Sequence, residues 1–109
     1  MANDLGLLRG TLDMLVLKAL IFGPRHGYAV TAWVRETTDE ALTIDDGALY
    51  GALHRLQARG LIAAEWGLSD NNRKAKYYSL TSTGRRDLRA QAATWSRYAT
   101  AVAKVMAAS

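Results

Sequence analysis

Apolar side chains recur at spacings of three and four residues in several parts of the chain, a pattern typical of amphipathic helices. A first helix is expected between Thr11, a candidate N-cap with Asp13 in the first turn, and the stop at Gly23-Pro24. A second helix is expected over residues 26–37. The residues expected on its buried side are Tyr28 or Ala29, Ala32 and Trp33.

A third helix is expected to be capped by Asp45 or Asp46 and to stop before Gly60. Its apolar stripe consists of Leu49, Ala52, Leu53 and Leu56. Small and polar residues lie on the opposite face, namely Gly47, Gly51, His54 and Ala58, flanked by Ala48, Tyr50 and Arg55. A glycine costs a helix about 1 kcal/mol relative to alanine, so two on one face suggest a close approach to another surface. Alternatively, Gly47 only starts the helix and Gly51 is a tolerated defect.

After the third helix, the pattern of apolar residues changes to one typical of β-strands. The segments "LIAAEWGL" and "AKYYSL" predict two short strands joined by turn-forming residues 69–73. Strand alternation makes Tyr77 and Tyr78 face opposite ways. One is expected to pack beneath the hairpin with Trp66 or Leu80, and the other to offer its hydroxyl outward; the sequence does not distinguish them.

Thr81 or Ser82 is expected to cap a last helix that runs nearly to the final residue. A heptad-like apolar seam follows this helix, formed by Leu88, Ala92, Trp95, Ala99, Val102 and Met106. A helix of about 25 residues is roughly 37 Å long, more than a small domain needs to cover its core. The seam therefore predicts a homodimer, to which Leu8 and Leu12 also contribute. Alternatively, the helix folds back onto the first helix of its own chain.

Charge is distributed unevenly along the 109 residues, which are long enough for one domain. The net charge is only +4. Residues 36–46 nevertheless hold five acids and no base, whereas residues 73–89 hold six bases against Asp87 alone. Such a cationic cluster attracts polyanions, although a solvated charged surface is the alternative interpretation.

Several function classes find no support in the sequence. The absence of cysteine excludes disulfides and thiolate metal sites and fits a reducing cytosol. His26 and His54 are too far apart in sequence to make a metal site by themselves. Motifs for catalysis, cofactor binding, secretion or membrane spanning are also missing. We expect a cytoplasmic protein that is not an enzyme and has no cofactor, metal or membrane partner.

The predicted order of helix, helix, helix, hairpin and long helix is that of a mainly α (α+β) winged helix-turn-helix fold. In such a fold the third helix reads the DNA major groove, and a basic hairpin, the wing, meets phosphates or the adjacent minor groove. The predicted contacts to double-stranded DNA are Gly47, Ala48, Tyr50, Gly51, His54, Arg55, Asn72, Arg73, Lys74, Lys76 and Tyr77.

Four stretches together resemble the PadR family of bacterial transcriptional regulators. They are "LLRGTLDMLVLKAL", "GPRHGYAV", "DDGALYGALHRLQARGLI" and "EWGLSDNNRKAKYYSLTSTGRR". The resemblance implies a winged-helix DNA-binding domain over residues 1–81 and a single dimerisation helix over residues 82–109, as in the short-tailed branch of the family. Many members have proline after the tyrosine of the signature Gly47 to Tyr50. This chain has Gly51 there, so the family's base preference does not transfer.

The resemblance also implies a repressor that binds a pseudo-palindromic operator as a homodimer and associates with the nucleoid when bound. Short-tailed relatives bind flat aromatic molecules near the dimer interface, which suggests a small aromatic effector for this chain. The predicted effector pocket is Trp95 with Leu8, Asp13 and Ala92; the alternative is a packed core tryptophan. Two other functions stay open: non-specific DNA binding, and a ligand- or protein-interaction module on the same scaffold.

Overall fold

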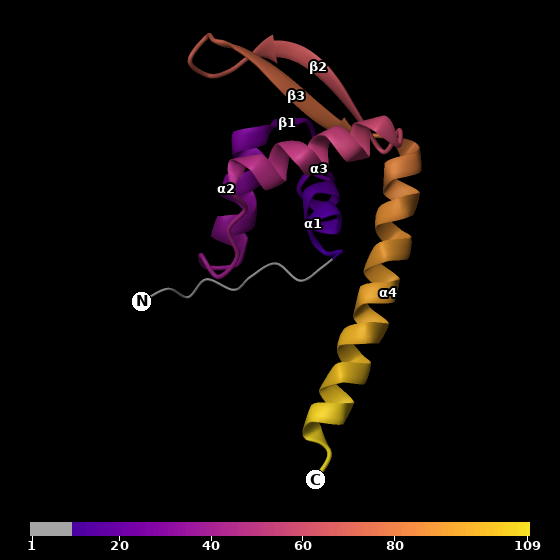
Figure 1. Ribbon diagram of the computed structural model, residues 1–109. Helices are drawn as coiled ribbons and strands as arrows, with labels where there is room; N and C mark the ends of the chain where they lie inside the picture. The colour runs from indigo at the N-terminus through magenta and orange to yellow at the C-terminus, as the bar shows by residue number, and fades with distance from the viewer. Residues whose placement is uncertain (1–9) are drawn as a thin grey trace.

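The computed structural model describes residues 10–109, in which three helices lie on one side of a three-stranded sheet and a fourth, long helix extends away from them (Figure 1). The elements are α1 (Leu12–Ala19), β1 (Arg25–His26), α2 (Gly27–Thr37), α3 (Asp46–Ala58), β2 (Ile62–Leu68), β3 (Lys74–Leu80) and α4 (Ser82–Ala107). The predicted order of elements and the winged helix-turn-helix fold are confirmed. Leu8, which was predicted for the dimer interface and the effector pocket, lies outside the described residues.

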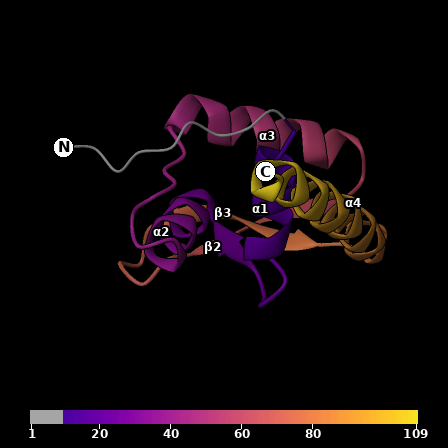
Figure 2. The same ribbon diagram turned by 90° about the horizontal axis from the view of Figure 1, so that it is seen from below.

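The core forms where α1, α2 and α3 meet beneath the sheet. The apolar stripe predicted for α3, Leu49, Ala52, Leu53 and Leu56, is buried as expected. Figure 2 shows α1 at the centre of the helices, and it contacts α2, α3 and α4. Burial of side chains contributed by all three helices is the main favourable term in holding α3 at a fixed angle.

The N-terminal ends of α3 and α4 follow the predicted capping chemistry, whereas α1 has no side-chain cap hydrogen bond at its N-cap position and ends at Ala19, before the predicted stop at Gly23-Pro24. The Asp45 carboxylate accepts a hydrogen bond from the amide of Ala48 at 2.8 Å, and the Thr81 hydroxyl accepts one from the amide of Gly84 at 2.9 Å. Each satisfies an amide that the first helical turn leaves unpaired. Gly60 has a φ of +75°, as expected of a residue that follows a helix in the left-handed region.

The predicted buried side of α2 is wrong except at Trp33, which packs partly buried against the core. Tyr28 is 70% exposed, and Ala29, Ala32 and Trp33 are only half-buried. The buried positions are Gly27, Val30, Thr31 and Val34. This stripe has helical spacing, but glycine and threonine hide it from a count of apolar residues. The Thr31 hydroxyl can be buried because it donates a hydrogen bond to the Gly27 carbonyl at 3.4 Å.

The sheet has the order β1-β3-β2 and is antiparallel. The hairpin of β2 and β3 matches the two predicted strands, and its turn contains Asn72 with a φ of +62°. The two-residue strand β1 was not predicted. It pairs Arg25 with Tyr78 and His26 with Tyr77, and thereby fixes the inner end of the hairpin against the start of α2.

The long helix α4 begins against the body of the molecule and then extends away from it (Figure 1). Gly84 and Leu88 are its buried residues. Leu88 is therefore wrong as the start of an exposed seam, because the first turns of α4 pack on the chain's own core. Across residues 10–109, α4 included, no helix combines the length and the apolar character that a bilayer crossing requires.

Candidate nucleic-acid interface

The outer face of α3 carries the predicted small residues. Gly47 and His54 are exposed, and Ala48 and Gly51 are half-buried. Tyr50 is 53% exposed. Few atoms therefore stand between the α3 backbone and an approaching surface. The geometry allows a close approach of the kind that a helix makes in a DNA major groove.

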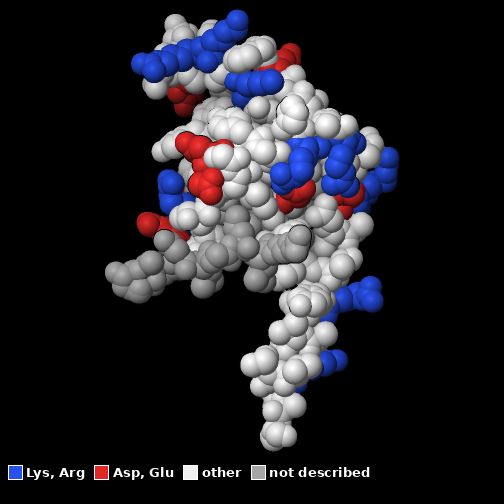
Figure 3. All heavy atoms as spheres, viewed as in Figure 1, with Lys and Arg blue, Asp and Glu red and all other residues white. Residues whose placement is uncertain are grey.

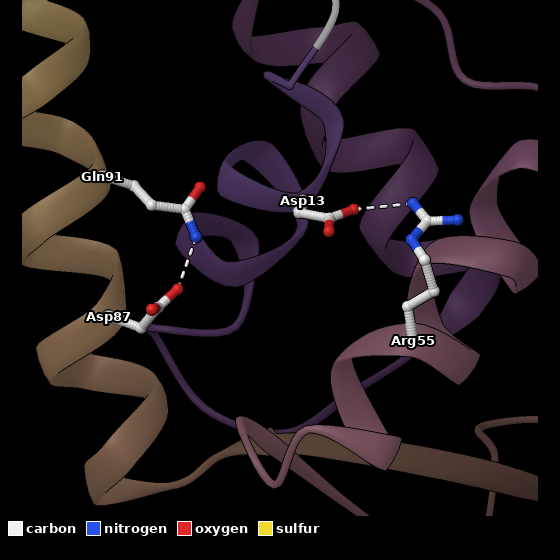
Figure 4. Close-up of polar contacts among 4 residues, drawn as sticks. All are labelled: Asp13, Arg55, Asp87 and Gln91. Atoms are coloured by element: carbon white, nitrogen blue, oxygen red, sulfur yellow. Dashed lines mark hydrogen bonds and ion pairs between the residues drawn. The ribbon is translucent and has the colours of Figure 1, made fainter.

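Arg55, on the same helix, lies in an ion pair that the sequence did not predict. Its guanidinium group is 2.8 Å from the Asp13 carboxylate of α1 (Figure 4). The Arg55 side chain remains 56% exposed, and an exposed pair of this kind is worth at most about 1 kcal/mol. Arg55 can therefore exchange Asp13 for a phosphate at low cost.

The basic residues of the wing, the β2–β3 hairpin with its turn at residues 69–73, are all exposed. These are Arg73, Lys74 and Lys76, beside exposed Asn72. Figure 3 shows Lys and Arg side chains at the free end of the hairpin. The ion pairs of residues 10–109 involve Arg55 and Arg59 and none of these wing cations. Their charge is thus open to an external anion.

The two adjacent tyrosines have different roles. Tyr78 is 6% exposed, on the face of the sheet that also carries Trp66 and Leu80. Burial, and secondly the nearby Tyr50, raises the pKa of the Tyr78 phenol. Tyr77 lies on the other face, and its hydroxyl donates to the Leu68 carbonyl at 3.1 Å. The Tyr77 hydroxyl therefore already has an acceptor within the wing.

A hollow of about 670 Å³ separates the wing from α2 and α3. Tyr28 and Tyr50 line it from the helices, and Trp66, Lys74 and Lys76 line it from the wing. Tyr28 and Trp66 were not among the predicted DNA contacts. Tyr28 was missed because it was expected to be buried. Trp66 was missed because it was expected to pack beneath the hairpin.

Gly27, the first residue of α2, forms the floor of this hollow. A Cβ atom at Gly27 would lie 3.0 Å from the Tyr50 hydroxyl oxygen and 3.3 Å from Leu49 Cδ2. Such contacts are tighter than ordinary packing allows. The absent side chain therefore leaves room for the Tyr50 ring and its hydroxyl.

A second hollow, of about 600 Å³, lies between the start of α1 and α4. Trp95 lines it as predicted, together with Met14, Gln91, Thr94 and Tyr98. Two of the predicted pocket residues do not line it. Asp13 instead pairs with Arg55, and Ala92 is exposed outside the hollow because the positions facing α1 follow the spacing 91, 94, 95 and 98.

Polar contacts connect this second hollow with α3. Gln91 donates to the Asp87 carboxylate within α4 (Figure 4). Asp87 also lies 3.7 Å from the guanidinium group of Arg59, the C-cap residue of α3. Together with the pair of Asp13 and Arg55, this contact ties both helices that border the hollow to α3.

Comparison with known proteins agrees with this geometry. The family model described as "Transcriptional regulator PadR-like family" matches residues 16–90. This range runs from α1 through both strands of the wing into the first turns of α4.

Individual relatives match over most of the chain. An uncharacterized protein, protein X of Lysinibacillus sphaericus, is 30% identical over 79 residues, or 72% of either chain. A transcriptional regulator from Clostridium thermocellum has a structure similar with a TM-score of 0.81 at 29% identity, covering 89% of this chain and 94% of its own. A PadR family transcriptional regulator from Eggerthella lenta has a TM-score of 0.79 at 35% identity, covering 93% and 86%.

Proposed function

Since the chain belongs to the PadR-like family of transcriptional regulators, we propose that it is a sequence-specific repressor. In this proposal it acts in the bacterial cytoplasm as a homodimer and joins the nucleoid when bound to a pseudo-palindromic operator. α3 supplies the contacts to base edges, and the wing supplies affinity for phosphates.

One observation carries the proposal: Tyr50 of α3 and two wing cations that make no ion pair among the described residues, Lys74 and Lys76, border the same hollow. Tyr50 lies on the α3 side of it, and Lys74 and Lys76 on the wing side. A duplex with α3 in its major groove brings a phosphate backbone beside the wing. The basic wing favours DNA over a protein or a ligand as the partner of this surface.

The exposed apolar side chains of α4 support the homodimer. Trp95 is 36%, Val102 41% and Met106 78% exposed. A stripe of this length on a protruding helix is typical of an interaction site, and a two-fold axis is the commonest arrangement. Such a dimer presents two α3 helices to half-sites about 34 Å apart.

The test is the fluorescence anisotropy of a labelled duplex taken from the DNA upstream of the protein's own gene. It is measured across salt concentrations with scrambled competitor DNA. Tight binding that survives the competitor is expected of a specific regulator. Binding that is lost equally to scrambled DNA, with a steep salt dependence, would instead identify a non-specific DNA-binding protein.

A pair of substitutions separates the two proposed contact types. Lys74→Ala is expected to weaken binding to all sequences alike and to reduce the salt slope by about one unit. His54→Ala is expected to change the ranking among sequences. A change of ranking for Lys74→Ala without a change of slope would contradict the assignment of the wing.

The proposal has a second part: a planar aromatic effector binds in the hollow that Trp95 lines and alters DNA binding. This part is tested by titrating planar aromatic compounds against a variant in which Trp95 is the sole tryptophan (Trp33→Phe with Trp66→Phe). A saturable change in fluorescence is expected from at least one compound of a broad panel. A panel without any saturable response would identify Trp95 as a packing residue only.

A further inference from the structure

The inner face of the wing places an aromatic ring beside two cations. In the antiparallel register, Trp66 lies directly opposite Lys76, and Leu68 lies opposite Lys74. Directly paired residues share one face of a sheet, so Trp66, Lys74 and Lys76 project on the same side. Nearer the core this face is buried, with Tyr78 on β3; toward the turn it borders the hollow above α3.

Both ammonium groups approach the indole ring. Lys74 Nζ is 5.4 Å and Lys76 Nζ is 5.9 Å from the ring centroid of Trp66. A cation near the face of an aromatic ring is attracted by the ring quadrupole, and tryptophan is the strongest such partner. No ion pair of the described residues involves either lysine. Both ammonium groups therefore lie near the Trp66 ring and outside any ion pair of the described residues.

Trp66 is not needed to complete the core. It is 60% exposed and is absent from the core cluster, to which β2 contributes Ile62. Its position at the border of the hollow, beside two cations, instead fits a role at the binding surface. A free lysine side chain loses considerable rotamer freedom when it binds a phosphate. A ring that already restrains the side chain reduces that loss.

We propose that Trp66 is a positioning residue for DNA binding, which holds the ammonium groups of Lys74 and Lys76 toward the phosphate backbone. The inference rests on the proposed function, because it concerns the same DNA surface. It adds a residue of β2 to a wing whose expected contacts all lie in the turn and in β3.

The experiment compares Trp66→Leu with Leu68→Ala as a matched control. Leu68 is on the same strand and face and is 66% exposed, but it has no aromatic ring. Binding is measured by anisotropy on the upstream duplex and on a scrambled duplex across salt concentrations. Trp66→Leu is expected to weaken both duplexes about fivefold at low salt and to lower the salt slope by about one unit. Leu68→Ala is expected to change neither quantity.

Two further readouts distinguish positioning from a structural role. Trp66→Phe, which keeps an aromatic face, is expected to recover most of the affinity, while thermal unfolding of all three variants stays at the wild-type temperature. In a Lys74→Gln/Lys76→Gln background, Trp66→Leu is expected to have no further effect, because coupled residues are not additive. The same fivefold loss in that background would overturn the inference.

The outcomes also separate this inference from the proposed function. A wild-type protein that binds the upstream duplex specifically, with Trp66→Leu unchanged in affinity and slope, overturns the role of Trp66 and leaves the proposed function standing. A wild-type protein that binds neither duplex overturns both.

Discussion

The first turns of α4 and the remainder of the same helix lie in opposite environments. Gly84 and Leu88 are buried against the body of the molecule, and Asp87 makes the contact with Arg59. From Ala92 onward every residue is exposed except half-buried Ala99. One continuous helix thus has a docked part, a middle part that borders the hollow shared with α1, and a protruding part that extends past the other elements of the described chain (Figure 1).

This difference separates two sources of helix stability. In the docked part, tertiary packing decides which residue fits: Gly84 lies where a side chain has no room, and Leu88 fills space in the core. In the protruding part only hydrogen bonds within the helix remain, and isolated helices are marginal in water. The apolar side chains exposed there, including Val102 and Met106, have a physical reason to be present if a second copy covers them. Substitutions in the docked part should therefore affect folding, and those in the protruding part assembly.

The largest effect is expected from Gly84→Ala. A methyl group at this position would overlap the Leu61 carbonyl oxygen, and it would lie 2.9 Å from Leu80 Cδ1. The free energy of unfolding is expected to fall by about 3 kcal/mol, measured by urea denaturation, even though alanine favours helices. Gly47→Ala is the control, because its methyl group would meet only the Asp45 carboxylate at 3.4 Å. Equal stability of the two variants would mean that α4 is not docked as described.

A charge in the protruding part is expected to break the dimer and spare the fold. Val102→Glu should weaken self-association at least about a hundredfold, because an unpaired carboxylate would be buried at the interface. Sedimentation equilibrium measures this change, and circular dichroism checks that the helices persist. Thr100→Glu lies off the predicted seam and should dimerise normally. A monomeric wild-type protein at high concentration would contradict the pairing itself.

A smaller loss is expected at the junction between the wing and α4. The Thr81 hydroxyl caps α4 and also donates to the Gly60 carbonyl at 2.8 Å. Thr81→Ala is expected to lower the free energy of unfolding by about 1 to 2 kcal/mol, measured in urea. Thr81→Ser retains the hydroxyl and should restore most of that loss; equal losses for serine and alanine would assign the effect to the methyl group.

The smallest effect is expected for the pair that joins α1 to α3. Both side chains are partly solvated, Arg55 at 56% and Asp13 at 23% exposed. A double-mutant cycle with Asp13→Asn and Arg55→Gln is expected to give a coupling free energy below about 1 kcal/mol in urea denaturation, and a smaller one at high salt. A coupling of several kcal/mol would show that α3 depends on α1 for its position far more than the exposure indicates.

The sequence predicted those features in which local chemistry and the core agree. The apolar residues of α3 have helical spacing and are also the buried ones, so the same pattern predicts both the helix and its buried face. The helix caps at Asp45 and Thr81 and the helix end at Gly60 could also be predicted. They depend on backbone groups and backbone conformation at a helix end, which residues next to it in the sequence satisfy. For the same reason the two long strands of the wing could be located from alternation and turn residues.

The sequence could not predict features that depend on tertiary contact. Arg55 and Asp13 are 42 residues apart, and no local period connects α3 with α1. The buried stripe of α2 begins with Gly27, which is buried because Tyr50 and Leu49 lie above it. Strand β1 is only two residues long and exists because β3 offers it a free edge. The approach of Lys74 and Lys76 to Trp66 likewise depends on the pairing register of β2 and β3, which composition does not reveal.

The most direct test of the central claim is the mass of the complex that the chain forms with a duplex of its own upstream DNA, measured by native mass spectrometry. The protruding part of α4 is expected to pair two copies, so that two α3 helices meet one operator. The predicted result is two chains per specific duplex, and loss of that species for Val102→Glu. A single chain per duplex, or a mass that grows steadily with the length of the duplex, would contradict the claim.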